Sequence, residues 1–155
     1  MADRTSSSIS VAAGRPDVLG VIAAFSEYPG WATGIKAAEV LADGPDGRPL
    51  RVRFVLDAGI IRDSYVLEYQ WDDDAAVRWQ LAEPGSVVTE MDGAYLLADS
   101  RTGTTVRYEL AVGTRVPMLG LMKRRAEKTI IDTALKGLKV RVESTRAADS
   151  DPGQQ

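Results

Sequence analysis

The chain has 155 residues, of which 45% are hydrophobic and 26% are charged, and its net charge at pH 7 is −3. This length suits one domain with its own hydrophobic core, and the negative charge argues against a dedicated nucleic-acid-binding protein, whose domains are usually strongly basic. The chain contains neither cysteine nor histidine, which excludes disulfide bonds, thiol nucleophiles, Ser-His-Asp triads and the usual zinc sites.

Both ends of the chain are polar. The first ten residues, MADRTSSSIS, show no basic segment followed by an apolar one, so no signal peptide is expected. No apolar run approaches the ~20 residues of a membrane-spanning helix. We therefore expect a cytoplasmic protein with one domain over residues 1–145 and a disordered polar tail over residues 146–155.

The first segments predict a strand, a helix and a turn. Residues 5–13 alternate serines with Ile9 and Val11, as an outer strand does. A helix is predicted to begin at Pro16, because proline suits the first helical turn. It is expected to end near residue 26, since Tyr28 precedes a proline and avoids the helical conformation. Residues 27–31 form a turn whose two aromatics either plug the end of the core or cover a cavity mouth.

Six alternating segments follow, and clusters of glycine, proline and aspartate separate most of them. Alternation with a period of two predicts half-buried strands, and short turns between strands favour antiparallel pairing. The segments span 35–42, 50–58, 60–71, 77–81, 87–97 and 104–112.

Residues 117–143 form the longest periodic segment and predict one amphipathic helix. Its apolar face is expected to contain Leu119, Met122, Ala126, Ile130, Ala134 and Leu138, and Ile131, Leu135 and Val142 widen it in the second half. Its opposite face contains Arg124, Arg125, Lys128, Asp132, Lys136 and Lys139. Glycine inside a helix costs about 1 kcal/mol relative to alanine. Gly120 and Gly137 therefore indicate either close backbone packing or space for another group.

Two motifs carry a family resemblance. The pattern Arg15-Pro16-Asp17-x-Leu19, followed by Tyr28-Pro29-x-Trp31, a run of strands and a long C-terminal helix, resembles the polyketide cyclase/dehydrase group of the SRPBCC superfamily. This superfamily includes START-like and birch-pollen-allergen-like proteins. Residues 116–127, VPMLGLMKRRAE, resemble the opening of the last helix in small proteins of this group. The resemblance covers residues 5–143.

The resemblance implies an α+β helix-grip fold. In this fold a seven-stranded antiparallel sheet wraps around a long C-terminal helix, in the order strand, two short helices, six strands and helix. It also implies a deep apolar cavity between the sheet and the helix. Members of the superfamily bind lipids, sterols, quinones, polyketides and plant hormones, and a minority are cyclases or dehydratases. The fold alone does not fix which of these applies.

Candidate ligand-binding residues follow from the expected cavity, because such pockets combine many apolar side chains with a few polar groups. They lie on the inward faces of the strands, in the aromatic turn and on the long helix. The set comprises Trp31, Phe54, Tyr65, Tyr69, Trp79, Met91, Tyr95, Tyr108, Met122, Ala126 and Ile130.

The candidate acid/base residues are Asp63, Lys123 and Glu127. By strand alternation Asp63 shares a face with Tyr65, and an inward carboxylate is costly unless it is paired. One interpretation is structural: Asp63 lies near the open end of the sheet or bonds a tyrosine or arginine. The other is functional: Asp63 orients a ligand, or it acts as a general acid or base with a raised pKa.

Two charged clusters have a simple explanation. The acidic run 72–74 resembles the start of a calcium loop, but Val77 stands where that loop needs glycine, so we interpret it as a solvated turn. We expect no metal and no cofactor. The cluster of Lys123, Arg124, Arg125 and Lys128 is either a solvated helix face or a contact for an anionic membrane surface or RNA.

Three functional hypotheses remain open at this point. The first is binding of a hydrophobic or amphipathic small molecule, such as a lipid, quinone or polyketide-like compound, without catalysis. The second is a polyketide aromatase/cyclase or dehydratase that uses the acid/base candidates in the same cavity. The third is an interaction module on a membrane or ribosome, with transient membrane contact through the C-terminal helix. We expect no nucleic-acid partner, and a monomer or a dimer.

Overall fold

The structure is a computed structural model that describes residues 4–57, 62–116 and 120–149. Its elements confirm the predicted order, with the second short helix formed as a 3₁₀ segment (η1). In chain order they are β1 (Thr5–Val11), α1 (Arg15–Ala23), η1 (Phe25–Gly30), β2 (Ile35–Asp43), β3 (Pro49–Asp57), β4 (Arg62–Asp72), β5 (Ala76–Glu83), β6 (Val88–Ser100), β7 (Gly103–Thr114) and α2 (Gly120–Asp149).

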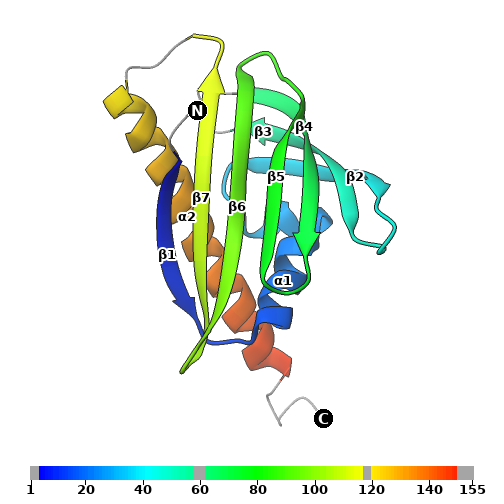
Figure 1. Ribbon diagram of the computed structural model, residues 1–155, viewed down its shortest axis with the longest axis vertical. Coiled ribbons are helices and arrows are strands. Elements are labelled where there is room, and N and C mark those ends of the chain that lie inside the picture. The colour runs from blue at the N-terminus through cyan, green and yellow to red at the C-terminus, as the bar shows by residue number, and fades with distance from the viewer. Residues whose placement is uncertain (1–3, 58–61, 117–119, 150–155) are drawn as a thin grey trace.

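The seven strands form one antiparallel sheet in the order β1-β7-β6-β5-β4-β3-β2. Strands β2 to β7 follow one another as hairpins, and β1 closes the sheet by pairing with β7, the last strand in the chain. Figure 1 shows α2 running behind β1 and β7, with α1 behind the sheet near the C-terminal end of α2. The predicted fold of a seven-stranded antiparallel sheet around a long C-terminal helix is confirmed.

The long helix ends later than predicted. It reaches Asp149, six residues beyond the expected end at Glu143. Three parts of the prediction lie outside the described residues. They are residues 58–61, where the predicted strands 50–58 and 60–71 meet, residues 117–119 at the predicted helix start, and residues 150–155 of the predicted tail. The domain boundary at residue 145 stays a prediction.

The side of α2 that faces the sheet matches the predicted face in the second half of the helix and differs from it in the first half. The buried side chains are Glu127, Ile131, Leu135, Leu138 and Val142. Met122 and Ile130, which were expected on this face, are 58% and 46% exposed, so their predicted position is wrong. The helix is rotated toward Glu127, because this carboxylate has partners on two strands.

Gly137 allows α2 to approach the end of η1. A Cβ atom at position 137 would lie 2.6 Å from the carbonyl oxygen of Trp31, closer than such atoms come in proteins. Of the two explanations open for this glycine, close backbone packing is therefore the correct one. A Cβ atom at position 120 would meet no atom of the described residues within 4 Å.

Two helical glycines give opposite predictions for alanine substitution. Gly137→Ala should destabilise the protein by about 1–3 kcal/mol, because the backbone of Trp31 must move away. Gly20→Ala in α1 should stabilise it by about 0.5–1 kcal/mol, since a Cβ there meets nothing within 4 Å. Urea unfolding followed by circular dichroism measures both changes. A Gly137→Ala protein as stable as the parent would contradict the close contact.

Candidate functional site

All five tyrosines of the chain lie inside the molecule, with 5–8% of their surface exposed. One comes from η1 and the other four come from β4, β6 and β7. Strand alternation places the strand tyrosines on the sheet face that carries the core, together with Phe54 and Trp79. This arrangement agrees with the predicted inward faces of these strands.

The aromatic side chains form a continuous cluster. Ring centroids of neighbouring members are 4.6–6.0 Å apart, within the range of favourable aromatic pairs. We call this set the aromatic cluster; it consists of Phe25, Tyr28, Phe54, Tyr65, Tyr69, Trp79, Tyr95 and Tyr108. Where the resemblance implies a deep cavity, these rings fill much of the space.

Six predicted ligand-binding residues belong to the aromatic cluster: Phe54, Tyr65, Tyr69, Trp79, Tyr95 and Tyr108. Trp31 is half-buried against Tyr28, with ring centroids 4.8 Å apart, and Met91 packs at the edge of the core. Ala126 is half-buried on α2, whereas Met122 and Ile130 are exposed and do not line the interior. Phe25 of η1 was expected on the apolar face of the predicted first helix, but sequence reasoning left it out of the ligand-binding set.

Four tyrosine hydroxyl groups lack a hydrogen-bond partner among the described residues. The Tyr28 hydroxyl donates a hydrogen bond to the carbonyl oxygen of Ile22. Those of Tyr65, Tyr69, Tyr95 and Tyr108 make no such bond within the described part of the chain. Among the described residues, the fully buried side-chain polar atoms without a partner are Trp31 Nε1 and Ser100 Oγ, and none is a tyrosine hydroxyl oxygen, so these hydroxyl groups keep some accessible surface. These hydroxyl groups are therefore suited to bind water or the polar group of a ligand.

The tyrosine hydroxyl groups are close enough to influence one another electrostatically. Burial raises the pKa of Tyr108 well above its ordinary value, and repulsion from Tyr95 and Tyr65 in their ionised form raises it further. Burial and the other four tyrosines raise the pKa of Tyr69 in the same way. For Tyr65, burial and the nearby Asp63 carboxylate raise the pKa. The tyrosines therefore stay neutral at pH 7 and serve as hydrogen-bond donors and acceptors.

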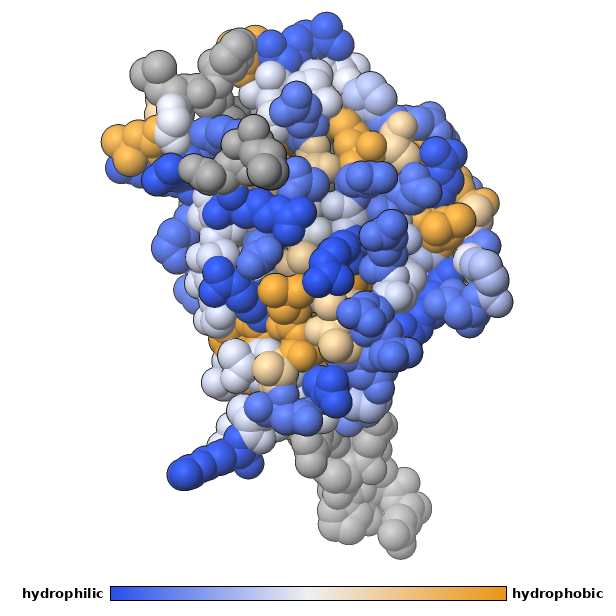
Figure 2. All heavy atoms as spheres, viewed as in Figure 1, coloured by the Kyte–Doolittle hydropathy of each residue, from blue (hydrophilic) through white to orange (hydrophobic). Residues whose placement is uncertain are grey.

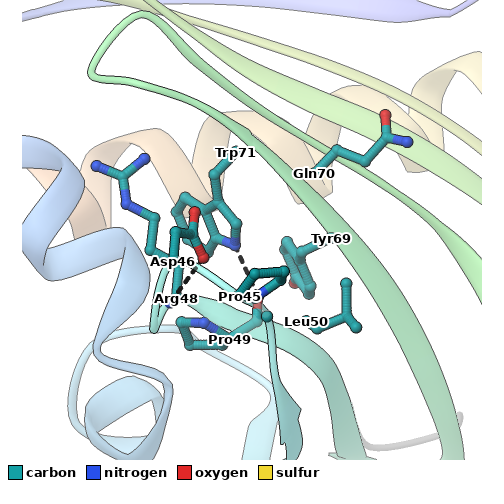
Figure 3. A pocket seen from close by; sticks show the side chains of 9 residues that line it. Pro45, Asp46, Arg48, Pro49, Leu50, Tyr69, Gln70 and Trp71 are labelled. Atoms are coloured by element: carbon teal, nitrogen blue, oxygen red, sulfur yellow. Dashed lines mark hydrogen bonds between the residues drawn. The ribbon is translucent and has the colours of Figure 1, made fainter.

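One surface hollow reaches the aromatic cluster. It measures about 340 Å³ and lies at the β2–β3 hairpin, where Tyr69 and Trp71 of β4 contribute to its lining. Figure 3 shows both rings pointing toward the hairpin, whereas Gln70 between them points away. The Trp71 indole donates a hydrogen bond of 2.6 Å to the carbonyl of Pro49, and the Arg48 guanidinium lies 5.6 Å from its ring centroid. Tyr69 thus connects this hollow to the interior.

A second hollow of about 340 Å³ lies between β1 and α2. It is lined by Arg4, Thr5, Arg124 and Lys128. The Arg4 guanidinium is held by Asp92 at 2.6 Å and by Glu109 at 3.2 Å. This hollow is basic and on the surface, and it shares no residue with the aromatic cluster.

The Asp63 carboxylate holds the connection between β5 and β6. Its oxygens accept backbone N–H groups from Ser64, Ser86, Val87 and Val88 at 2.7–3.0 Å. Partial burial raises the pKa of Asp63, but the four backbone hydrogen bonds outweigh it and the net pKa lies below the ordinary value. These contacts give Asp63 a structural role and correct the expected pairing with a tyrosine or arginine.

The carboxylate of Glu127 also has structural partners. It is 2% exposed and accepts hydrogen bonds of 2.7 Å from the Thr5 hydroxyl and from the backbone N–H of Val112. Lys123, the third acid/base candidate, is half-buried one turn earlier on α2. The carboxylates of Asp63 and Glu127 thus bond backbone and hydroxyl donors, and the structure does not bring the three candidates together into one acid/base set.

The fold and the interior define a helix-grip protein with a tyrosine-rich core. The chain belongs to the family described as polyketide cyclase/dehydrase and lipid transport, whose model matches residues 2–143. None of the curated proteins matches the chain. Within the described residues no helix is long and apolar enough to cross a membrane.

Solved structures share this fold at low sequence identity. A START superfamily protein from Mycobacterium smegmatis has a TM-score of 0.85 and 21% identity, over 93% of this chain and 99% of its own. A protein from Thermus thermophilus has a TM-score of 0.76 and 21% identity, over 92% and 98%. The Zhui aromatase/cyclase from a Streptomyces species has a TM-score of 0.75 and 15% identity, over 95% and 97%.

Replacing single tyrosines by phenylalanine shows, through the change in stability, which hydroxyl groups make a hydrogen bond within the protein. Tyr28→Phe should destabilise the protein by about 1 kcal/mol, because the hydrogen bond to Ile22 is lost. Tyr95→Phe should change stability by less than about 0.5 kcal/mol, since no protein partner loses a bond. Thermal and urea unfolding of both variants give the comparison. Equal destabilisation by the two substitutions would show that Tyr95 also has a protein partner.

The Asp63 hydrogen bonds predict a pH-dependent stability. Because folding lowers the pKa of Asp63 from 3.8, its contribution is complete above that value and is lost as pH falls through the folded pKa. Asp63→Asn should therefore destabilise the protein by about 1–3 kcal/mol at pH 7, and the difference from the parent should shrink below about pH 4. Urea unfolding across this pH range measures it. Asp43→Asn on exposed β2 is the control. A loss of stability in Asp63→Asn that does not change with pH would contradict the structural role of the Asp63 carboxylate.

Proposed function

We propose that the protein binds a hydrophobic or amphipathic small molecule between the sheet and α2. The ligand is a lipid, quinone or polyketide-like compound, and the protein acts as its carrier, sensor or store. The observation that carries this proposal is the set of four tyrosine hydroxyl groups that have no hydrogen-bond partner among the described residues, in a mostly apolar interior. Membership in a family described by both cyclisation and lipid transport supports the same class of ligand.

The aromatic cluster suits such a ligand in its chemistry. Ligand sites are mostly apolar and contain a few placed polar groups that orient the bound molecule. Rings of Phe54 and Trp79 provide apolar surface, while the hydroxyl groups of Tyr95 and Tyr108 provide polar contacts. Because these rings touch one another in the free protein, binding requires some of them to turn aside. The hollow beside Tyr69 gives a place where this rearrangement can begin.

The alternative function is a polyketide aromatase/cyclase or dehydratase. The family description and the shared fold with the Zhui aromatase/cyclase favour it. The acid/base chemistry has less support, because the Asp63 and Glu127 carboxylates accept structural hydrogen bonds and burial raises the pKa of the tyrosines. Incubation with a polyketide-like substrate tests this alternative by product analysis, and the absence of turnover would remove it.

A binding experiment tests the proposed function. Purified protein is mixed with a panel of fatty acids, phospholipids, quinones and aromatic polyketides, and uptake is measured by native mass spectrometry and tryptophan fluorescence. For a ligand with a polar group, Tyr95→Phe or Tyr108→Phe should weaken binding about fivefold, the effect of one lost hydrogen bond of about 1 kcal/mol.

Tyr28→Phe is the matched control for this experiment. Its hydroxyl already donates to Ile22, so its removal should leave affinity for the ligand unchanged once stability is taken into account. Failure of every ligand class to bind would refute the proposal. Binding that is insensitive to Tyr95 and Tyr108 would place the ligand elsewhere.

A further inference from the structure

The first turns of α2 expose apolar side chains to solvent. Leu121 is 73% exposed and Met122 is 58% exposed, and Val116 just before the helix is 75% exposed. Ile130 on the next turns is 46% exposed. Figure 2 shows hydrophobic atoms beside hydrophilic ones at the corner of the molecule where α2 begins. These side chains add nothing to the core, so folding does not explain them.

Basic side chains surround these apolar residues. We call the combined surface the α2 patch; it consists of Leu121, Met122, Lys123, Arg124, Arg125 and Lys128. The one carboxylate within this stretch, Glu127, is buried and points into the fold. Lys128 pairs with Asp132 at 3.2 Å on the exposed surface. A chain with a net charge of −3 therefore carries a local positive surface at one end.

The position of the charges is unfavourable for the helix itself. The N-terminal end of a helix carries a partial positive charge and is stabilised by acidic side chains, not by basic ones. The first turn of α2 contains no acidic residue, and three basic residues follow directly at positions 123–125. Helix stability alone would favour acidic side chains at the start of α2. A negatively charged partner outside the protein would account for the basic side chains found there.

We propose that the α2 patch docks on an anionic lipid surface. Basic residues attract the acidic head groups, while exposed leucine and methionine enter the boundary between head groups and acyl chains. Figure 1 shows the start of α2 projecting at one corner of the molecule, where a flat surface can reach it. The hollow beside β1 shares Arg124 and Lys128 with the patch, while its Arg4 pairs with Asp92 and Glu109. This proposal does not depend on ligand binding in the interior.

Other partners fit the α2 patch less well. A symmetric dimer through this surface would bring the basic residues of one copy against those of the other, because the same patch meets itself across a two-fold axis. A nucleic acid would satisfy the charges but would leave Leu121 and Met122 in water, and the patch has no aromatic residue on which bases stack. A lipid surface satisfies both the charge and the apolar side chains.

Vesicle cosedimentation of the full chain tests the docking. The protein should sediment with vesicles of phosphatidylcholine and phosphatidylglycerol, and much less with phosphatidylcholine alone. Binding should fall as salt is raised from about 0.1 M to about 1 M, because the Debye length shrinks from about 10 Å to about 3 Å. Lys123→Gln with Arg125→Gln should weaken binding about 25-fold, at about fivefold per charge near the surface.

The apolar contribution has its own variant and a matched control. Leu121→Asp with Met122→Asp should weaken binding at least tenfold, because the inserted side chains are lost. Lys136→Gln with Val140→Asp changes one basic and one exposed apolar residue farther along the same helix and should bind like the parent. Circular dichroism confirms that each variant is folded.

Four outcomes would overturn the docking proposal. They are no binding to anionic vesicles, equal binding to neutral vesicles, full binding by either patch variant, and equal loss in the control variant. Dimerisation that requires the α2 patch, measured by analytical ultracentrifugation, or patch-dependent binding of RNA without vesicle binding, would assign the surface to another partner.

Discussion

The hydrogen bonds of Glu127 determine how α2 sits on the sheet. A carboxylate that is 2% exposed is stable only if its oxygens have partners, and here they have Thr5 on β1 and Val112 on β7. Because these partners belong to two strands, they fix the rotation of the helix about its own axis. With Glu127 turned inward, Ile131 and Leu138 also face the sheet, whereas Met122 and Ile130 face solvent. The interior and the α2 patch both depend on this rotation.

Small residues allow the large aromatic ones to fit. Gly93 on β6 lies opposite Trp79 on β5, and a Cβ there would lie 2.5 Å from the indole ring. Gly137 makes room for the backbone carbonyl of Trp31 at the end of η1. Protein interiors are packed as densely as organic crystals, so each ring needs a defined space. The aromatic cluster is consequently closely packed, and its tyrosine hydroxyl groups add polar atoms to an interior that also holds Thr104 and Glu127.

Most of the fold was predictable because it depends on local patterns. Two-residue alternation located every strand to within a few residues, and the helical repeat located α2. The rotation of α2 was only partly predictable. The helical repeat placed Ile131, Leu135, Leu138 and Val142 on the side that faces the sheet, but the inward position of Glu127 depends on partners that are 15 and 122 residues away in the chain. The role of Asp63 escaped prediction for the same reason, since three of its partners lie 23–25 residues away. The aromatic cluster was largely predictable, as strand alternation puts its rings on one face.

The buried side of α2 packs on the sheet and stabilises the helix, so the exposed side chains of its first turns are free to serve another role. Contacts of Ile131, Leu135, Leu138 and Val142 with the core stabilise α2, so its first turns need not be optimal as an isolated helix. This freedom lets basic and apolar side chains occupy an exposed end where they are unfavourable for helix formation. A helix is about 10–12 Å across with its side chains. A lipid surface held at the α2 patch would therefore lie about one helix diameter from the sheet-facing side of α2, a short path for a ligand that is poorly soluble in water.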